Sequence, residues 1–525
     1  MARILVTESI AEGGLDRLRA AGHDVDVRLE LSPDELRSAI CGAHALIIRS
    51  ATQVDAEALA AADELLVVGR AGIGLDNVDV AAATERGVVV VNAPQSNIIS
   101  AAEHTMALLL AQARNVPQAH AALVDGRWER TEWEGVELAD KTLGIVGLGR
   151  IGKLVADRAK AFQMRLIAFD PFVSTERARQ LGVEVVPLEQ VMAESDFLTI
   201  HLPKTKDTTG LIDRDMMLKA KPGMRIINVA RGGIVDEHDL ADCIRDGAIA
   251  GAGLDVFDNE PTTESPLFEL PSVVVTPHLG ASTREAQDKA GDAIADMVQL
   301  ALAGDFVPWA VNVDATEAHE KIRPFLSLAE TLGRLYGSLH RSSPDSFEVI
   351  CQGEIAAYDT RIIGLAVLKG FFSRLTDEPV SYVNAPSMAK SAGITMREIN
   401  SAESDEYVNL ITLRCENHHS ISGTFSHIPG RRSEPRIVEV DGHGFDVPPA
   451  PHMLVISNDD RPGVIGSVGT ILGNHDLNIS DMDVGRVPDS GRAMMLLATT
   501  TEVTGEVLDE LRAAPGMLIV SALQG

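Results

Sequence analysis

Thr142-Leu-Gly-Ile-Val-Gly-Leu-Gly-Arg-Ile-Gly152 joins an apolar run to a glycine-rich turn, and a helical pattern follows from Lys153 to Ala161. Gly147, Gly149 and Gly152 provide the tight turn, the close backbone approach and the close helix packing that a pyrophosphate needs. The N-terminus of the next helix adds free N–H groups and the positive end of a dipole. The stretch therefore predicts a Rossmann fold that binds a dinucleotide.

Asp170 ends the next predicted strand, where a carboxylate accepts hydrogen bonds from the adenosine ribose. The same carboxylate repels the 2′-phosphate of NADP. A glycine triad alone is a common feature of structural turns. The strand, the helix and Asp170 together favour NAD as the cofactor.

Short β-branched runs alternate with Ala- and Leu-rich helical patterns on both sides of this turn, which indicates parallel α/β structure. The chain leaves the first series, builds a second and returns, so we expect two parallel-sheet lobes with a cleft between them. An α+β region and a small ferredoxin-like βαββαβ module follow, separated by the Pro-rich segment 447–451. The predicted domains are 1–97 completed by 285–315, then 98–284, 316–450 and 453–525.

The composition excludes several classes of protein. A chain of 525 residues is too long to fold around a single hydrophobic core. Its formal net charge of −30 opposes binding to nucleic acid or to anionic membranes. The four cysteines show neither metal-site spacing nor disulfide density, so no metal site is expected and a reducing cytoplasm fits best. The N-terminal segment is typical of a first strand rather than of a signal peptide, and no membrane span is predicted.

Three polar residues follow predicted strands of the second lobe: Arg231, Glu260 and His278. Loops at the carboxyl edge of a parallel sheet meet in one crevice, so these side chains are expected to lie together. A carboxylate bonded to an imidazole favours a general base, and a guanidinium fork grips a carboxylate at two points. Taken singly, the histidine is more often structural and the arginine more often solvated.

The segments that carry these residues resemble the D-isomer-specific 2-hydroxyacid dehydrogenases over roughly the first 315 residues. The matching segments are Asn228-Val-Ala-Arg-Gly-Gly-Ile-Val-Asp236, Leu254-Asp-Val-Phe-Asp-Asn-Glu-Pro261 and Thr276-Pro-His-Leu-Gly280. The resemblance implies that Arg231 orients the substrate carboxylate and carbonyl, that His278 exchanges the hydroxyl proton and that Glu260 supports His278. It also implies that NAD is lined by Arg150, Ile151, Asp170, Leu202, Ala230, Asp255 and Gly280 beside the three glycines.

The stretch Arg70-Ala-Gly-Ile-Gly-Leu-Asp-Asn-Val-Asp79 is similar to the branch of the family that oxidises 3-phospho-D-glycerate. This resemblance implies NAD-dependent formation of 3-phosphohydroxypyruvate, the first step of L-serine biosynthesis. Arg49, Ser50 and Arg70 are then the candidates that bind the small anionic substrate, although each is also an ordinary surface residue type. Family members associate, which implies a homodimer or homotetramer.

The C-terminal module resembles an ACT domain, a small unit that binds amino acids, often between two copies. Asn458, Asp460 and Asn478 are the candidates for binding L-serine as an effector, and helix or turn capping is the alternative use of such residues. Region 316–450 resembles the intervening domain of the longest family form. Arg431, Arg432 and Arg436 there suggest an anion site, for which a solvated loop is the simpler explanation.

Two other functions remain open on the sequence. Another D-2-hydroxyacid dehydrogenase, acting on glyoxylate, glycerate or a longer keto acid, would lack a phosphate-binding arginine cluster. A non-catalytic NAD-sensing protein, similar to corepressors on this fold, would bind NADH tightly and turn over no keto acid. The appended amino-acid-binding module favours a metabolic enzyme over the second alternative.

Overall fold

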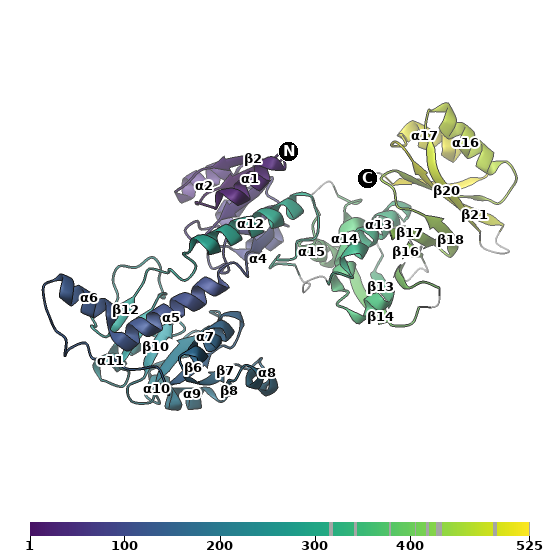
Figure 1. The fold of residues 1–525 in the computed structure, drawn as a ribbon. Helices are drawn as coiled ribbons and strands as arrows, with labels where there is room; N and C mark the ends of the chain where they lie inside the picture. The colour runs from purple at the N-terminus through teal and green to yellow at the C-terminus, as the bar shows by residue number, and fades with distance from the viewer. Residues whose placement is uncertain are drawn as a thin grey trace.

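A computed structural model of the chain describes residues 1–313, 319–340, 344–376, 380–404, 406–415, 419–426, 433–486 and 491–523. Figure 1 shows four folded parts, with the ACT-like module at the end of the molecule opposite the dinucleotide lobe. None of the described helices combines the length and the apolar character needed to span a lipid bilayer.

The first lobe is a parallel sheet of five strands in the order β2-β1-β3-β4-β5. Its strands are short and mostly buried, as expected for a parallel sheet covered by helices on both faces. The elements are β1 (Arg3–Val6), α1 (Glu12–Ala20), β2 (Asp24–Val27), α2 (Pro33–Ile40), β3 (Ala45–Ile48), α3 (Ala56–Ala61), β4 (Val67–Arg70), α4 (Val80–Glu85) and β5 (Val89–Asn92). The strand order changes direction between β1 and β3, where such sheets bind ligands beyond the carboxyl ends of their strands.

The second lobe holds a seven-stranded parallel sheet in the order β12-β11-β10-β9-β6-β7-β8. Its order changes direction between β6 and β9, so the glycine turn after β6 lies at the ligand-binding point. The helices are α5 (Ile98–Arg114), α6 (Val116–Val124), α7 (Arg150–Ala161), α8 (Thr175–Gln180), α9 (Leu188–Glu194), α10 (Arg214–Met217) and α11 (Glu237–Arg245). The strands are β6 (Thr142–Val146), β7 (Arg165–Phe169), β8 (Glu184–Val185), β9 (Phe197–Ile200), β10 (Arg225–Asn228), β11 (Gly251–Leu254) and β12 (Val273–Val275).

Helix α12 (Arg284–Leu302) returns the chain to the first lobe, where it packs against α1 (Figure 1). The apolar segment that follows joins β5 by a single antiparallel bridge between Val91 and Ala310 and by side-chain bonds from Asn312. The expected return of the chain is therefore present, although the segment forms no regular strand.

The third part carries a six-stranded mixed sheet in the order β14-β13-β15-β16-β17-β18. Its helical elements are α13 (Arg323–Leu339), the 3₁₀ turn η1 (Glu354–Ala357), α14 (Arg361–Phe372) and α15 (Ala385–Ser391). Its strands are β13 (Ser346–Gly353), β14 (Thr395–Ser401), β15 (Asn409–Cys415), β16 (Ser420–Ser426), β17 (Glu434–Val440) and β18 (His443–Val447). Two antiparallel pairs of this sheet, β15–β16 and β17–β18, join strands that follow each other in the chain.

The last part is β19 (Met453–Asp459), α16 (Val464–Asn474), β20 (Ile479–Arg486), β21 (Arg492–Thr499), α17 (Gly505–Ala513) and β22 (Met517–Leu523). The sheet order β20-β21-β19-β22 is that of a ferredoxin-like βαββαβ unit, as the sequence predicts. The Pro-rich segment before β19 does not separate two independent cores. Met453, Val455 and Leu496 are buried in the same cluster as Phe347 and Leu413 of the third part.

Candidate functional site

The glycine turn has the geometry that each of its glycines predicts. Gly147 has φ 97°, and a Cβ there would lie 2.7 Å from the carbonyl oxygen of His201. A Cβ at Gly152 would lie 2.2 Å from the carbonyl oxygen of Gly147, so the helix packs directly on the turn. Gly149 faces open space at the start of α7, where a phosphate reaches the backbone N–H groups. These residues fit a bound dinucleotide.

Asp170 lies beside this turn, just after β7. Its carboxylate accepts hydrogen bonds from the backbone N–H groups of Leu148 and Phe172, both at 2.8 Å. Each oxygen keeps a second lone pair for a ribose hydroxyl. Leu202 follows β9 on the other side of the turn, and the guanidinium of Arg150 contacts the carbonyl of Pro94 at 3.4 Å. Ile151 is half-buried in the first turn of α7.

Asn228 shapes the turn that carries Arg231. Its side chain accepts a hydrogen bond from the Ala230 N–H at 3.0 Å and donates to the Arg231 carbonyl at 2.9 Å. The Arg231 guanidinium donates to the Ala230 carbonyl and pairs through Nε with Asp76 Oδ2 at 3.3 Å. Because Asp76 belongs to the first lobe, Arg231 reaches across the cleft between the two lobes.

His278 and Glu260 form the pair that their order in the sequence suggests. His278 Nδ1 lies 2.5 Å from Glu260 Oε2, and Glu260 Oε1 accepts the Phe257 N–H at 2.8 Å. His278 has φ 54°, a left-handed conformation that is unusual outside glycine, and its side chain is 44% exposed. With Nδ1 committed to the carboxylate, Nε2 is left for a substrate.

Asp255 lies beneath this loop, and its side chain is completely buried. Its oxygens accept the N–H groups of Leu279 and Gly280 at 2.7 and 2.8 Å and contact the Thr276 hydroxyl at 2.6 Å. His104 Nε2 approaches the same carboxylate at 3.2 Å. Burial acts to raise the pKa of Asp255, but the His104, Thr276 and Leu279 bonds outweigh it and lower that pKa. The carboxylate thus holds the His278 loop in place from below.

The first lobe contributes Arg49, Ser50 and Arg70 at the carboxyl ends of β3 and β4. Glu8, just after β1, accepts the backbone N–H groups of Arg49, Ala51 and Thr52 at 2.8 to 3.1 Å. Burial acts to raise the pKa of Glu8, and these N–H bonds outweigh it so that the pKa is lowered. The loop is therefore fixed by a half-buried carboxylate, with Ser50 exposed on it.

The Arg70 side chain is half-buried beside Gly72, and its guanidinium is not fully hydrogen-bonded. Its Nε is buried without a hydrogen-bond partner among the described residues. Burial, together with the neighbouring charge of Arg231, lowers the pKa of Arg70 to about 10. The carboxylates of Asp76 and Glu8 act against this lowering, and Arg49 adds to it, so three arginines and two carboxylates from both lobes share one electrostatic environment. The excess of positive charge favours an anion.

Four residues that position this site were not singled out from the sequence: Glu8, Asp76, His104 and Thr276. Each acts through a partner more than 20 residues away, although Thr276 also lies two residues before His278. Of these four, Thr276 could have been noticed from the sequence, because it begins the Thr276–Gly280 segment that carries His278.

The candidates of the last part do not converge within one chain. Asn458 is buried near the end of β19 and donates to the Asp459 carbonyl, while its Oδ1 has no partner among the described residues. Asp460 is exposed and lies 3.5 Å from Arg486. Asn478 precedes β20 at the opposite end of the sheet, because Asn458 pairs with Ala493 whereas Ile479 pairs with Thr499.

The basic segment of the third part is described only at its end. Arg431 and Arg432 lie outside the described residues. Arg436 lies near Glu434 and Asp446, at 3.6 and 3.7 Å, so its charge is already balanced by acidic neighbours.

Comparison with known families divides the chain into three matching segments. Residues 106–280 match the D-isomer specific 2-hydroxyacid dehydrogenase NAD binding domain. Residues 321–441 match the D-3-phosphoglycerate dehydrogenase intervening domain, and residues 452–516 match the ACT domain.

Individual relatives extend this similarity over the whole chain. The chain is 46% identical over 517 residues to D-3-phosphoglycerate dehydrogenase of Mycobacterium tuberculosis, covering 97% of each protein. The corresponding enzyme of Archaeoglobus fulgidus is 41% identical, covering 98% of each. Among solved structures, a protein from Thermus thermophilus aligns over 59% of this chain and 99% of its own, with a TM-score of 0.55 and 36% identity. D-lactate dehydrogenase of Escherichia coli aligns over 59% of this chain and 99% of its own, with a TM-score of 0.53 and 25% identity.

Proposed function

Because the chain belongs to the D-3-phosphoglycerate dehydrogenases of the D-isomer-specific 2-hydroxyacid dehydrogenase family, we propose that it oxidises 3-phospho-D-glycerate to 3-phosphohydroxypyruvate with NAD. This reaction is the first step of L-serine biosynthesis. One observation supports this substrate best: the guanidinium groups of Arg70 and Arg231 both lie against the loop of Gly72 and Gly74, and the second lobe, which carries Arg231, also carries the His278–Glu260 pair.

Proton transfer is the task of His278. The Glu260 carboxylate accepts a hydrogen bond from the Nδ1–H of His278, which fixes the tautomer and leaves the Nε2 lone pair for the substrate. In the oxidation direction Nε2 takes the C2 hydroxyl proton, and Glu260 then stabilises the imidazolium. When bound, NAD accepts the hydride that leaves C2.

Anion binding is the task of the arginines. Arg231 is released from Asp76 and turns its planar fork to the substrate carboxylate and the forming carbonyl oxygen. Arg49 and Arg70 balance the phosphate, which relieves the mutual repulsion of the three guanidinium groups. Asp255 accepts hydrogen bonds from the loop that carries His278, and these bonds keep His278 in a fixed position relative to the bound anion.

The test is a steady-state assay of NADH oxidation with 3-phosphohydroxypyruvate, hydroxypyruvate, glyoxylate and pyruvate, each with and without L-serine. We expect kcat/KM for the phosphorylated keto acid to exceed the others by at least about 100-fold, because arginines placed to bind charged oxygen atoms are left unpaired by a substrate that lacks the phosphate. A preference for an unphosphorylated keto acid would identify another D-2-hydroxyacid dehydrogenase. Tight NADH binding without turnover of any keto acid would identify an NAD-sensing protein.

Replacing Arg70 by methionine should separate stability from substrate binding. The lowering of its pKa from 12.5 to about 10 corresponds to a folding cost on the order of 3 kcal/mol. The cost is present at every pH below about 10 and is relieved only above that value. Arg70→Met should therefore raise the melting temperature by several degrees, equally at pH 6 and pH 8, as measured by calorimetry.

The same variant should raise KM for 3-phosphohydroxypyruvate at least about tenfold, since one charge-assisted contact is lost. KM for unphosphorylated hydroxypyruvate should change much less. Equal losses for both keto acids would place the phosphate elsewhere.

We place effector binding in the ACT domain and name L-serine as the effector. The buried, unpartnered Oδ1 of Asn458 supports this assignment. Since Asn478 lies at the opposite end of its own sheet, the proposed site takes Asn458 and Asp460 from one copy and Asn478 from a second. Asn478→Ala should then abolish serine inhibition in the assay above without changing kcat in its absence.

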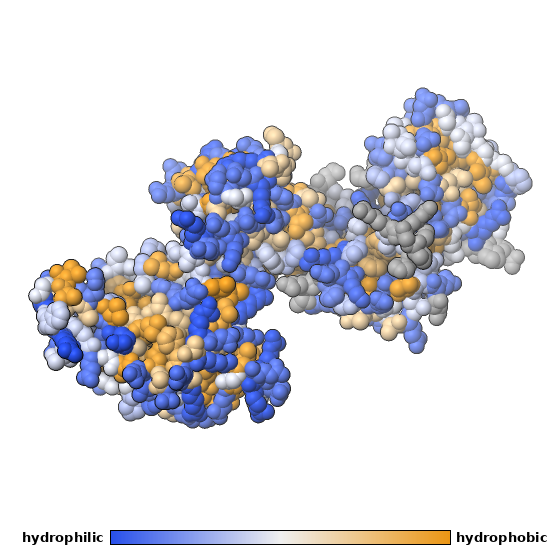
Figure 2. Space-filling model, in the orientation of Figure 1, coloured by the Kyte–Doolittle hydropathy of each residue, from blue (hydrophilic) through white to orange (hydrophobic). Residues whose placement is uncertain are grey.

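We infer a homodimer or homotetramer, with one contact over α6. Val116, Leu123, Val124 and Trp128 are 56%, 56%, 74% and 82% exposed, and Figure 2 shows apolar side chains gathered over α6. Apolar groups exposed together in this way are typical of an interface.

We also assign the enzyme to the cytoplasm, because Cys41, Cys243, Cys351 and Cys415 are free thiols. We propose the domain limits expected from the sequence, with two domains for catalysis and two for regulation.

A further inference from the structure

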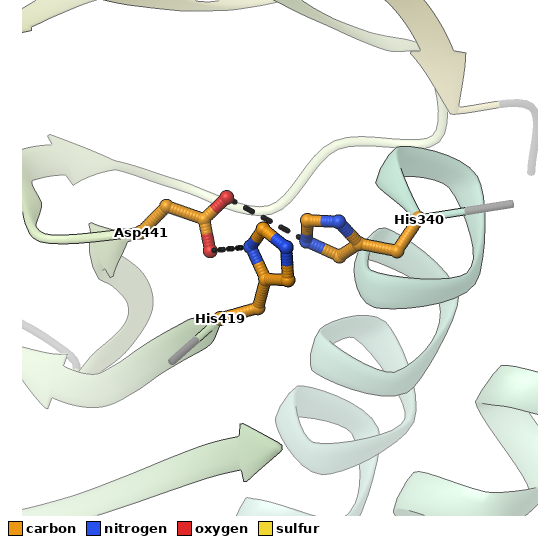
Figure 3. A group of neighbouring side chains, drawn as sticks. All are labelled: His340, His419 and Asp441. Carbon is orange, nitrogen blue, oxygen red and sulfur yellow. Dashed lines mark ion pairs between the residues drawn. The ribbon is translucent and has the colours of Figure 1, made fainter. Parts of the chain in front are cut away.

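Two histidines and one aspartate meet at a corner of the third part, far from the catalytic cleft in sequence (Figure 3). His340 directly follows α13, His419 directly precedes β16, and Asp441 lies in the turn between β17 and β18. One possible ligand atom from each lies within 4.8 Å of the others. The proposed dehydrogenase reaction assigns no role to any of the three.

The distances between these atoms match those within a coordination sphere. Asp441 Oδ1 lies 3.2 Å from His419 Nδ1, and Asp441 Oδ2 lies 3.6 Å from His340 Nε2. Two ligands of a tetrahedral zinc ion lie about 3.3 Å apart, given metal–nitrogen and metal–oxygen bonds of about 2.0 to 2.1 Å. The two imidazole rings lie against each other, with centroids 3.8 Å apart, and both present nitrogen atoms to the same carboxylate.

One of these nitrogen atoms is left without a partner. His340 Nε2 is buried and makes no hydrogen bond to the described residues, and its side chain is 13% exposed. A buried polar atom in that state costs about 1 to 3 kcal/mol. A cation between Nε2 and the Asp441 carboxylate removes this cost, since both groups then act as ligands.

The surrounding backbone holds the three groups in place before any ion binds. Asp441 and Gly442 have φ 47° and 77°, which indicates a tight hairpin turn of the primed type. The Asp441 N–H donates to the Ser420 carbonyl at 2.7 Å, and the Ser420 N–H donates to Asp441 Oδ1 at 3.1 Å. Tyr336, one helical turn before His340, packs on its ring with centroids 4.6 Å apart. A hairpin turn alone accounts for Asp441, but it does not account for two histidines directed at its carboxylate.

We propose that His340, His419 and Asp441 bind one Zn²⁺ ion, with water as the fourth ligand. Imidazole nitrogen and carboxylate oxygen are ligands that zinc prefers, and zinc forms tetrahedral sites of this size. The ion joins the C-terminal end of α13 to the β17–β18 hairpin. Both elements also pack on the ACT sheet, α13 against β22 and β18 against β20, so the ion fixes the part of the intervening domain on which that sheet rests.

Zinc binding is tested on the full-length protein after treatment with EDTA and dialysis. The bound metal is counted by mass spectrometry after equilibration with ZnCl₂, and CoCl₂ is used as a spectroscopic substitute. Asp441→Asn and His419→Gln remove single ligands; asparagine tolerates the left-handed turn, and His419 is 40% exposed, so both variants should fold. His475→Gln is the matched control, because His475 pairs with Glu510 at 2.7 Å but no third ligand was found beside that pair in the described chain.

We expect the wild type to bind one more Zn²⁺ per chain than Asp441→Asn, and zinc to raise the melting temperature of the wild type but not of that variant. His419→Gln should lower zinc affinity at least about tenfold, since the loss of a partner outside the coordination sphere already costs roughly 10- to 100-fold. Co²⁺ should give the visible absorption of a tetrahedral site in the wild type and in His475→Gln alone. Equal zinc content and equal melting shifts in wild type and Asp441→Asn would overturn the proposal, leaving a hydrogen-bonded His–Asp cluster.

Discussion

Replacing His278 by asparagine should lower kcat by about 100- to 10,000-fold, the range expected when a general base is lost. Asparagine suits the test because residue 278 has φ 54°, a conformation that asparagine adopts readily and alanine does not. The backbone N–H of residue 278, which donates to the Asp255 carbonyl at 2.9 Å, is retained. The loop should therefore keep its position while Nε2 disappears.

Stopped-flow or steady-state measurement of 3-phosphohydroxypyruvate reduction gives the kcat of this variant, and NADH fluorescence gives its cofactor affinity. The affinity should stay within about threefold of the wild type, because the glycine turn and Asp170 are untouched. A variant that keeps more than a tenth of the wild-type kcat would show that another group transfers the proton.

The parts of the fold that repeat a pattern were predictable from the sequence. Helix α5 and strands β3, β6, β9 and β10 begin and end at the residues that the apolar pattern indicates. Their boundaries are clear because buried parallel strands are continuous apolar runs and the helix carries a long apolar face. Strand β4 ends at Arg70, which puts that charged side chain at the carboxyl edge of the sheet.

Contacts that depend on single polar residues were not predictable in the same way. Asp255 and His104 are 151 residues apart, and neither the helix pattern of α5 nor the strand before Asp255 indicates that they meet. The His340, His419 and Asp441 cluster is a stronger case, since its members come from the end of a helix, the residue before a strand and a hairpin turn. Such contacts follow from the packing of whole elements, which residue spacing does not encode.

The distance between the candidate residues of the ACT domain could not be predicted either, because it depends on the direction in which the strands run. Asn458 and Asn478 flank the helix α16 in sequence, and both side chains suit an amino-acid ligand. Because β19 and β20 each pair antiparallel with β21, the end of β19 lies beside the end of β20 and far from its start. In the proposed effector site, a second copy of the chain therefore supplies the Asn478 side chain.

Arg231→Lys should lower kcat/KM for 3-phosphohydroxypyruvate by about 100- to 1,000-fold while the positive charge is retained. The guanidinium is proposed to hold the carboxylate and the carbonyl oxygen at once, and a lysine ammonium offers a single point of contact. One lost charge-assisted hydrogen bond is worth about 1.5 to 3 kcal/mol, and misplacement of the carbonyl adds to this. The loss should appear in kcat as well as KM, because the carbonyl contact strengthens as the reaction proceeds.

Arg214→Lys is the matched control, since Arg214 pairs with Asp246 on the surface and lies outside the cleft. It should leave both kinetic constants unchanged. Asp76→Asn gives the complementary result: Asp76 contacts Arg231 Nε at 3.3 Å and competes with the substrate carboxylate, so its loss should lower KM or leave it unchanged. If Arg231→Lys raised KM alone, Arg231 would bind substrate and transition state equally, and stabilisation of the carbonyl oxygen would have to come from another group in the cleft.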